Sequence, residues 1–68
     1  MPRPLDPVTL RHFVAVCEEG SIARAAAREA LVASALSKRI GALEAEVGVP
    51  LLVRRRRGVA PTPAGEAL

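Results

Sequence analysis

The chain has 68 residues, enough for one small domain, with ten Lys and Arg, seven Asp and Glu, a formal net charge of +3 and a single cysteine. One cysteine excludes an intrachain disulfide, and no apolar run approaches the ~20 residues that span a bilayer, so we expect a soluble, cytoplasmic protein with no membrane partner. A core this small stabilises a fold only marginally. A dimer, or further chain beyond residue 68, is therefore expected.

The first predicted element is a helix over residues 7–19, preceded by an extended leader at residues 1–5. Asp6 is a typical N-cap, and Pro7 suits the first helical position, where its missing N–H is no loss. Helical spacing predicts one apolar, buried face, formed by Leu10, Phe13, Val14 and Cys17. Cys17 is then a small buried hydrophobe rather than a reactive thiol, and His12, off this stripe, is expected at the surface.

Two further helices are predicted after Gly20, which can end the first helix in the left-handed conformation. Ser21 caps a short helix whose inward residues are small. A longer helix follows Val32 and ends at Gly48, with a buried stripe predicted from its spacing. The stripe consists of Leu36, Ile40, Leu43 and Val47. Hydroxyl and basic side chains lie outward near the start of this helix, which predicts an anionic partner there.

A short β-hairpin is predicted next, with four consecutive arginines, residues 54–57, and Gly58 at its tip. Pro61 limits further pairing, so the hairpin should be short and at an edge. Thr62 and Pro63 repeat the cap-plus-proline pattern and open another helix. The fold class is therefore mainly α: a three-helix winged helix-turn-helix domain over residues 1–61, with the start of a truncated linker helix over residues 62–68.

Residues 10–68 resemble, without a gap, the N-terminal DNA-binding domain of LysR-type bacterial transcriptional regulators. The matching segments are LRHFVAVCEEGSIARAA (10–26), ALSKRIGALEAEVGVPLL (35–52), Arg54, RGV (57–59) and TPAGEAL (62–68). The resemblance implies sequence-specific binding of double-stranded DNA without a cofactor or metal. It also implies a homodimer or higher homo-oligomer through the linker helix, and a small-molecule effector bound only by a C-terminal domain absent from this sequence.

The resemblance also implies which residues contact DNA. Ser37 and Lys38 would enter the major groove, Ser21 and Arg24 would hold flanking phosphates, and the arginine wing would reach the minor groove. Lys38 stands where the family commonly has arginine, so the charge is kept but the bidentate fork is lost. The full predicted set is Ser21, Arg24, Ala33, Ser34, Ser37, Lys38, Arg54, Arg55, Arg56, Arg57 and Thr62.

Two departures from the family pattern fall around the turn before the third helix. Glu29 replaces a usual leucine, and we expect it near the surface with Leu31 filling the space, because an unpaired buried carboxylate costs several kcal/mol. Val32-Ala33-Ser34 replaces a usual Ser-Gln-Pro. Ala33 lacks the amide that pairs with adenine and offers only a methyl group for a thymine methyl, which predicts a less sharply defined site.

An enzyme is not supported, because the chain has one His, one Cys, no glycine-rich phosphate loop and no pair of carboxylates with a cleft to share. One alternative is a winged-helix protein-interaction module with weak or nonspecific DNA binding, favoured by Glu29 and the altered segment 32–34. Another winged-helix family, such as molybdate-responsive or multidrug-response regulators, is a second alternative, and a merely solvated arginine loop is a third. The TPAG segment and the helix-turn-helix spacing favour the LysR family.

Overall fold

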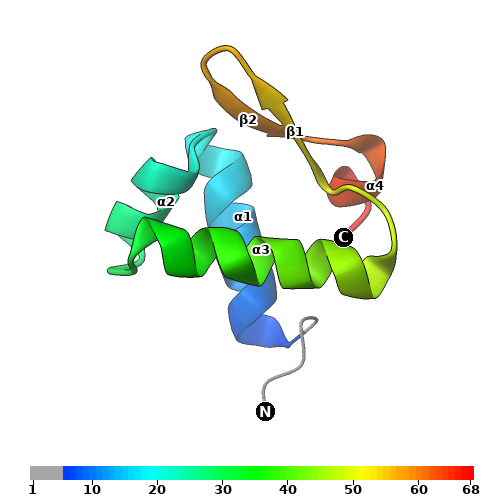
Figure 1. Cartoon of the computed structure of the whole chain (residues 1–68), viewed down its shortest axis with the longest axis horizontal. Helices are drawn as coiled ribbons and strands as arrows, with labels where there is room; N and C mark the ends of the chain where they lie inside the picture. Colours follow the sequence, from blue (N-terminus) through cyan, green and yellow to red (C-terminus); the bar gives the residue numbers. More distant parts are fainter. Residues whose placement is uncertain (1–5) are drawn as a thin grey trace.

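The computed structural model describes residues 6–68, so the predicted extended leader at residues 1–5 lies outside the described residues. Three helices are followed by a two-stranded hairpin and a last helical turn (Figure 1). The elements are α1 (Pro7–Glu19), α2 (Ile22–Arg28), α3 (Ala33–Val47), β1 (Leu52–Arg55), β2 (Gly58–Pro61) and α4 (Pro63–Glu66). The predicted fold class is confirmed, and none of the helices in the described part of the chain is long and apolar enough to cross a membrane.

Local capping chemistry places the helix boundaries where the sequence predicts them. The Asp6 carboxylate accepts the backbone N–H of Thr9 at 2.8 Å, and the Ser21 hydroxyl accepts that of Arg24 at 3.2 Å. Gly20 ends α1 with φ +67°, and a glycine at position 48 ends α3 with φ +88°. Left-handed backbone of this kind is adopted most readily by glycine.

The core lies where α1, α2 and α3 meet; α3 crosses α1, and α2 lies beside α1 near the start of α3 (Figure 1). Alanines at the α2 contact let the helices approach closely, and Leu36, Ile40 and Leu43 of α3 are buried as predicted. Val47, at the end of that stripe, is 37% exposed, so the prediction that it is buried is wrong. The buried apolar residues are Phe13, Ala15, Val16, Ala25, Ala26, Leu36, Ile40, Leu43 and Leu51.

The predicted apolar face of α1 is wrong in part. Phe13 is buried, but Val14 is 49% exposed, and Leu10 and Cys17 are only half-buried. The helix instead turns Thr9, His12 and Val16 inward, and both α2 and α3 pack against α1. The prediction that His12 lies at the surface is therefore wrong.

The wing pairs β1 with β2 in an antiparallel register from Leu52 opposite Pro61 to Arg55 opposite Gly58. The predicted tip was too long, since two of the four arginines belong to β1 and only those at 56 and 57 form the turn. The backbone N–H of Val59 donates to the Gly20 carbonyl at 3.0 Å. A Cβ atom at position 58 would collide with that same carbonyl oxygen, so this close contact between wing and helices requires glycine.

A carboxylate from α3 holds the base of the wing. Glu44 Oε2 accepts the backbone N–H of Leu51 at 2.7 Å and that of Leu52 at 3.2 Å. Hydrogen bonds to a charged acceptor are stronger than neutral ones. The position of the wing is thereby tied both to the turn between α1 and α2 and to α3.

Candidate nucleic-acid interface

The first two turns of α3 present a polar, basic face to solvent. Ala33, Ser34 and Lys38 are exposed, and Ser37 is half-buried. Residues four apart lie one above the other on a helix, so Ala33 stacks with Ser37 and Ser34 with Lys38. Leu36 is fully buried on the opposite side. Packing of α3 thus fixes which of its side chains meet a partner.

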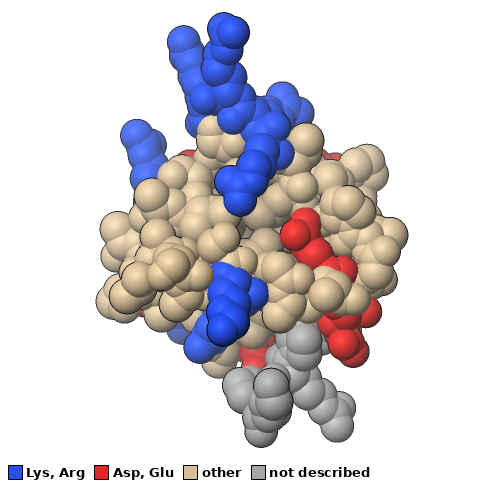
Figure 2. Space-filling view, viewed as in Figure 1, with Lys and Arg blue, Asp and Glu red and all other residues tan. Residues whose placement is uncertain are grey.

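Positive charge gathers over the wing. Figure 2 shows several blue Lys and Arg side chains standing clear at the wing end of the molecule and a further blue group lower on the same face, while the largest red patches also lie lower in this view. All four wing arginines, residues 54–57, are exposed. Arg24 of α2 and Lys38 and Arg39 of α3 are exposed as well. A surface of this kind attracts a polyanion at long range.

The wing and α3 share one groove. Arg54 of β1 and Ser37 of α3 both line a hollow of about 180 Å³ between these two elements. The sequence predicts both as contact residues, and the structure brings them together. The tip arginines, residues 56 and 57, lie in the turn of the hairpin.

The two hydroxyl groups differ in whether their O–H donor is still available to a partner. Ser21 uses its oxygen as the acceptor of the α2 cap, so its O–H remains a donor for an outside group. Thr62 donates its hydroxyl to the Pro50 carbonyl at 2.8 Å and accepts the N–H of Gly65 at 3.1 Å. Its single O–H donor is therefore already used within the fold.

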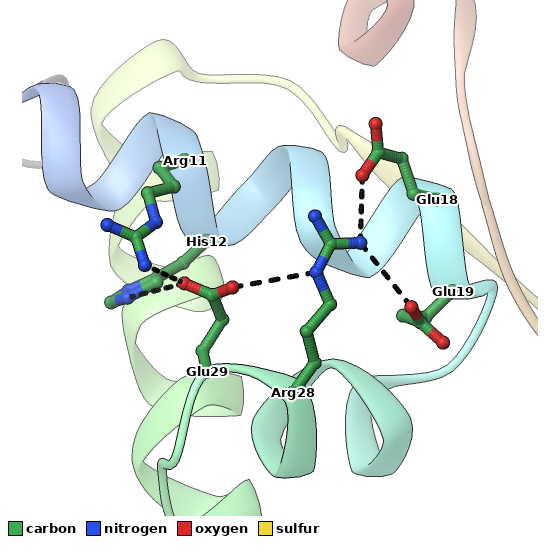
Figure 3. Close-up of polar contacts among 6 residues, drawn as sticks. All are labelled: Arg11, His12, Glu18, Glu19, Arg28 and Glu29. Atoms are coloured by element: carbon green, nitrogen blue, oxygen red, sulfur yellow. Dashed lines mark hydrogen bonds and ion pairs between the residues drawn. The ribbon is translucent and has the colours of Figure 1, made fainter.

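Not every arginine on α2 is available to a partner. Arg28 Nη1 lies 2.8 Å from Glu18 Oε1 and 3.4 Å from Glu19 Oε2, which together raise the pKa of Arg28 (Figure 3). Within residues 6–68 no carboxylate pairs with Arg24. Arg24 is thus the cation of α2 that remains available for a phosphate.

The prediction that Glu29 lies near the surface is wrong. Its side chain is only 7% exposed, with Oε1 2.9 Å from Arg11 Nη2 and 3.9 Å from His12 Nε2, and Oε2 3.6 Å from Arg28 Nε (Figure 3). Within the described residues Oε1 makes no well-directed hydrogen bond, so the Arg11 contact is an ion pair without hydrogen-bond geometry. Burial is tolerated because α1 supplies the counter-charge, while Leu31 packs against the core as predicted.

Two features of this surface have no direct signal in the sequence. Val32, the N-cap of α3, makes no side-chain capping bond and is 68% exposed. Glu44 of α3 is half-buried against the base of the wing, where it accepts the backbone N–H of Leu51. Only the absence of a Ser, Thr, Asp or Asn at position 32 could have signalled the first feature.

No group of three His, Cys, Asp or Glu residues within residues 6–68 is arranged to hold a metal ion. The geometry instead combines a helix-turn-helix pair with a basic wing that shares a groove with its second helix. This arrangement defines the chain as a winged helix-turn-helix protein of the regulatory type.

Comparison with known proteins narrows this class. Residues 8–66 match the family described as bacterial regulatory helix-turn-helix protein, lysR family. The transcriptional activator AllS of Klebsiella pneumoniae is 49% identical over 61 residues, which is 90% of this chain and 23% of AllS. The transcriptional regulator PgrR of Escherichia coli is 49% identical over 59 residues, 87% of this chain and 20% of PgrR.

Solved structures agree with this assignment. The complex of the CbnR DNA-binding domain with DNA matches with a TM-score of 0.81 and 43% identity, over 85% of this chain and 67% of that one. The complex of the BenM DNA-binding domain with catB site 1 DNA matches with a TM-score of 0.81 and 45% identity, over 85% of this chain and 65% of that one.

The chain belongs to the lysR family and is the DNA-binding domain of a LysR-type transcriptional regulator. The predicted resemblance is confirmed. Because the family consists of transcriptional regulators, the prediction that the chain is not an enzyme is confirmed as well. The chain spans about a fifth of the length of AllS and PgrR.

Proposed function

We propose that the chain binds double-stranded DNA sequence-specifically, with the start of α3 in the major groove and the arginine wing at the neighbouring minor groove. The observation that carries this proposal is the shared groove of Ser37 and Arg54, which joins the outer face of α3 to the basic wing. The similar domains of CbnR and BenM have been solved in complex with DNA, which supports the same docking here.

Each candidate residue has a role that its surroundings support. Ser34, Ser37 and Lys38 face the base edges of the major groove, where hydroxyls and ammonium groups form hydrogen bonds. Ser21 and Arg24 hold backbone phosphates, since the hydroxyl keeps its donor and the guanidinium has no internal partner among residues 6–68. Ala33 offers a methyl group beside them.

The wing supplies charge. Arg54 reaches the phosphates next to the groove, and the tip at Arg56 and Arg57 enters the minor groove, where A-tracts concentrate negative potential. Arg55, on the outside of β1, adds to the long-range attraction. Thr62 acts indirectly, because its hydroxyl joins Pro50 to the start of α4 and so holds the base of the wing.

The chain is the N-terminal part of a longer cytoplasmic regulator in this proposal. The turn of α4 that begins at Pro63 continues as a linker helix through which the protein forms a homodimer or higher homo-oligomer. An effector of small-molecule size binds a domain beyond residue 68. The share of AllS and PgrR that this chain spans, about a fifth, supports such an arrangement.

A fluorescence anisotropy titration with labelled duplex DNA of mixed sequence at low salt tests the proposal. Sequence-independent contacts to phosphates predict saturable binding with a Kd of about 1 µM or tighter, weakening steeply as salt rises. Selection from a random duplex library then yields preferred sites. Absence of binding by the folded chain would overturn the proposal and favour the protein-interaction module.

A further inference from the structure

The residue that precedes α3 is apolar and points outward. Val32 occupies the N-cap of α3 with extended backbone, φ −75° and ψ 134°, and makes no capping hydrogen bond. At 68% it is the most exposed of the large hydrophobic side chains in residues 6–68. Valine is among the poorest N-caps, so neither capping nor packing in the fold explains this side chain.

The surroundings of Val32 indicate what covers it. Ala33, which is also exposed, extends the apolar surface onto the first turn of α3. The exposed cations Arg24, Lys38 and Arg39 lie on the two helices that meet at this turn. An apolar spot between two helices that carry exposed positive charge suits a polyanion that has apolar groups between its phosphates, which is the character of the DNA major groove.

We propose that Val32, with Ala33 beside it, reads the 5-methyl group of thymine in the major groove. This inference rests on the proposed function and names the chemical group that the start of α3 selects. The thymine methyl is the apolar group that base edges display in that groove, and apolar side chains contact it directly. The side chains of Val32 and Ala33 offer no hydrogen-bond donor or acceptor.

Val32 and Ala33 favour thymine and also disfavour the other bases. Burying a methyl group against Val32 gains about 0.8 kcal/mol, or about fourfold in affinity. A cytosine or guanine at the same position would turn a polar edge toward the apolar side chains and lose its water without a new partner. The preferred site therefore carries thymine opposite the start of α3.

Deoxyuridine, which differs from thymidine in the base only by the missing methyl, isolates the effect. The chain is first used to select a preferred duplex from a random library. Each thymine of that duplex is then replaced in turn by deoxyuridine, and affinities are measured by anisotropy. At one or two positions the loss of the methyl should weaken binding about fourfold. Cytosine there should weaken binding further, and 5-methylcytosine should restore part of the loss.

Variants of Val32 and Ala33 test whether these side chains cause the dependence of affinity on the thymine methyl. Val32→Ser, alone or with Ala33→Ser, should fold, because serine is a favoured N-cap, and the double variant should no longer distinguish deoxyuridine from thymidine. Val49→Ser is the matched control, since Val49 is 43% exposed beyond the opposite end of α3. It should retain the full dependence on the methyl group.

The outcomes separate this inference from the function on which it rests. Equal affinity for thymidine and deoxyuridine at every position overturns the reading of the thymine methyl but not DNA binding. The same holds if the affinity of the double variant still depends fully on the methyl group. Failure of the folded chain to bind any duplex overturns both.

Discussion

The Glu29 carboxylate lies 2.9 Å from the guanidinium of Arg11, with the carboxylate side chain 7% exposed and the arginine side chain 73% exposed. A desolvated carboxylate thus depends on a largely hydrated partner. The attraction is partly screened by water on the arginine side, while the desolvation of Glu29 is nearly complete. The pair joins the end of α2 to α1, and we expect it to stabilise the fold less than a well-packed apolar contact would.

Replacing this carboxylate by an apolar side chain should stabilise the domain. Glu29→Leu is expected to raise the free energy of unfolding by about 1–2 kcal/mol, because buried ion pairs are often weaker than well-packed hydrophobic replacements. Arg11→Ala should lower it by about 1 kcal/mol, because Glu29 then keeps only the more distant guanidinium of Arg28, 3.6 Å away. Urea unfolding followed by circular dichroism measures both.

The double variant completes the cycle for this pair. In the Glu29→Leu background, Arg11→Ala should have almost no effect, because the carboxylate that needs the guanidinium is gone. A loss of stability in Glu29→Leu alone would contradict the account and would mean that the ion pair stabilises the fold.

The wing should depend on Glu44. Glu44→Ala removes the acceptor for the N–H groups of Leu51 and Leu52, at a cost of about 1–3 kcal/mol. Amide hydrogen exchange at these two residues should accelerate, whereas Glu44→Gln, which keeps a carbonyl acceptor, should restore part of the protection. Equal exchange rates in the wild type and the alanine variant would show that the carboxylate does not hold the wing.

Cys17 should be a slow nucleophile in the folded chain. Burial, and then the nearby Glu18 and Glu66, raise the pKa of the Cys17 thiol above its ordinary value. Because the thiolate is the reactive form, alkylation by iodoacetamide at pH 8 should be slower in the folded chain than in urea. The neutral Cys17 thiol contributes fully to the stability of the fold below the unfolded pKa, and this contribution is lost as the pH rises through the folded pKa. Equal alkylation rates in the two states would contradict this.

The arginines of the wing should set the salt dependence of DNA binding. Each phosphate contact contributes about 0.9 to the slope of log affinity against log salt concentration. Replacing Arg55 and Arg56 by alanine should therefore reduce the slope by about 1–2 units. Arg28→Ala is the control, since Arg28 pairs with Glu18 and Glu19, and it should leave the slope unchanged. An unchanged slope in the wing variant would mean that these side chains are merely solvated.

Local signals and distant contacts differ in how far the sequence reveals them. Asp6-Pro7, Gly20-Ser21 and Gly48 predict the limits of α1, α2 and α3, because a cap is formed by neighbours in the chain. The burial of His12 and Glu29 depends instead on two helices meeting with those faces inward.

The candidate site likewise depends on both local spacing and distant contacts. Helical spacing is sufficient to place Ser34, Ser37 and Lys38 on the outer face of α3. The contact of Glu44 with the base of the wing depends on how the chain returns after Gly48, and no residue pattern encodes that return. The extent of β1 was underestimated because arginine is neither a strong former nor a breaker of strands.

In the proposed complex the start of α3 and the wing bind duplex DNA together. A titration of the isotopically labelled chain with a selected duplex, followed by NMR of the backbone amides, tests it most directly. Chemical-shift changes should be concentrated in residues 33–38 and 54–57, with little change on the exposed face of α1 around Val14. Changes confined to α1 and α4, or changes at α3 without any at the wing, would contradict it.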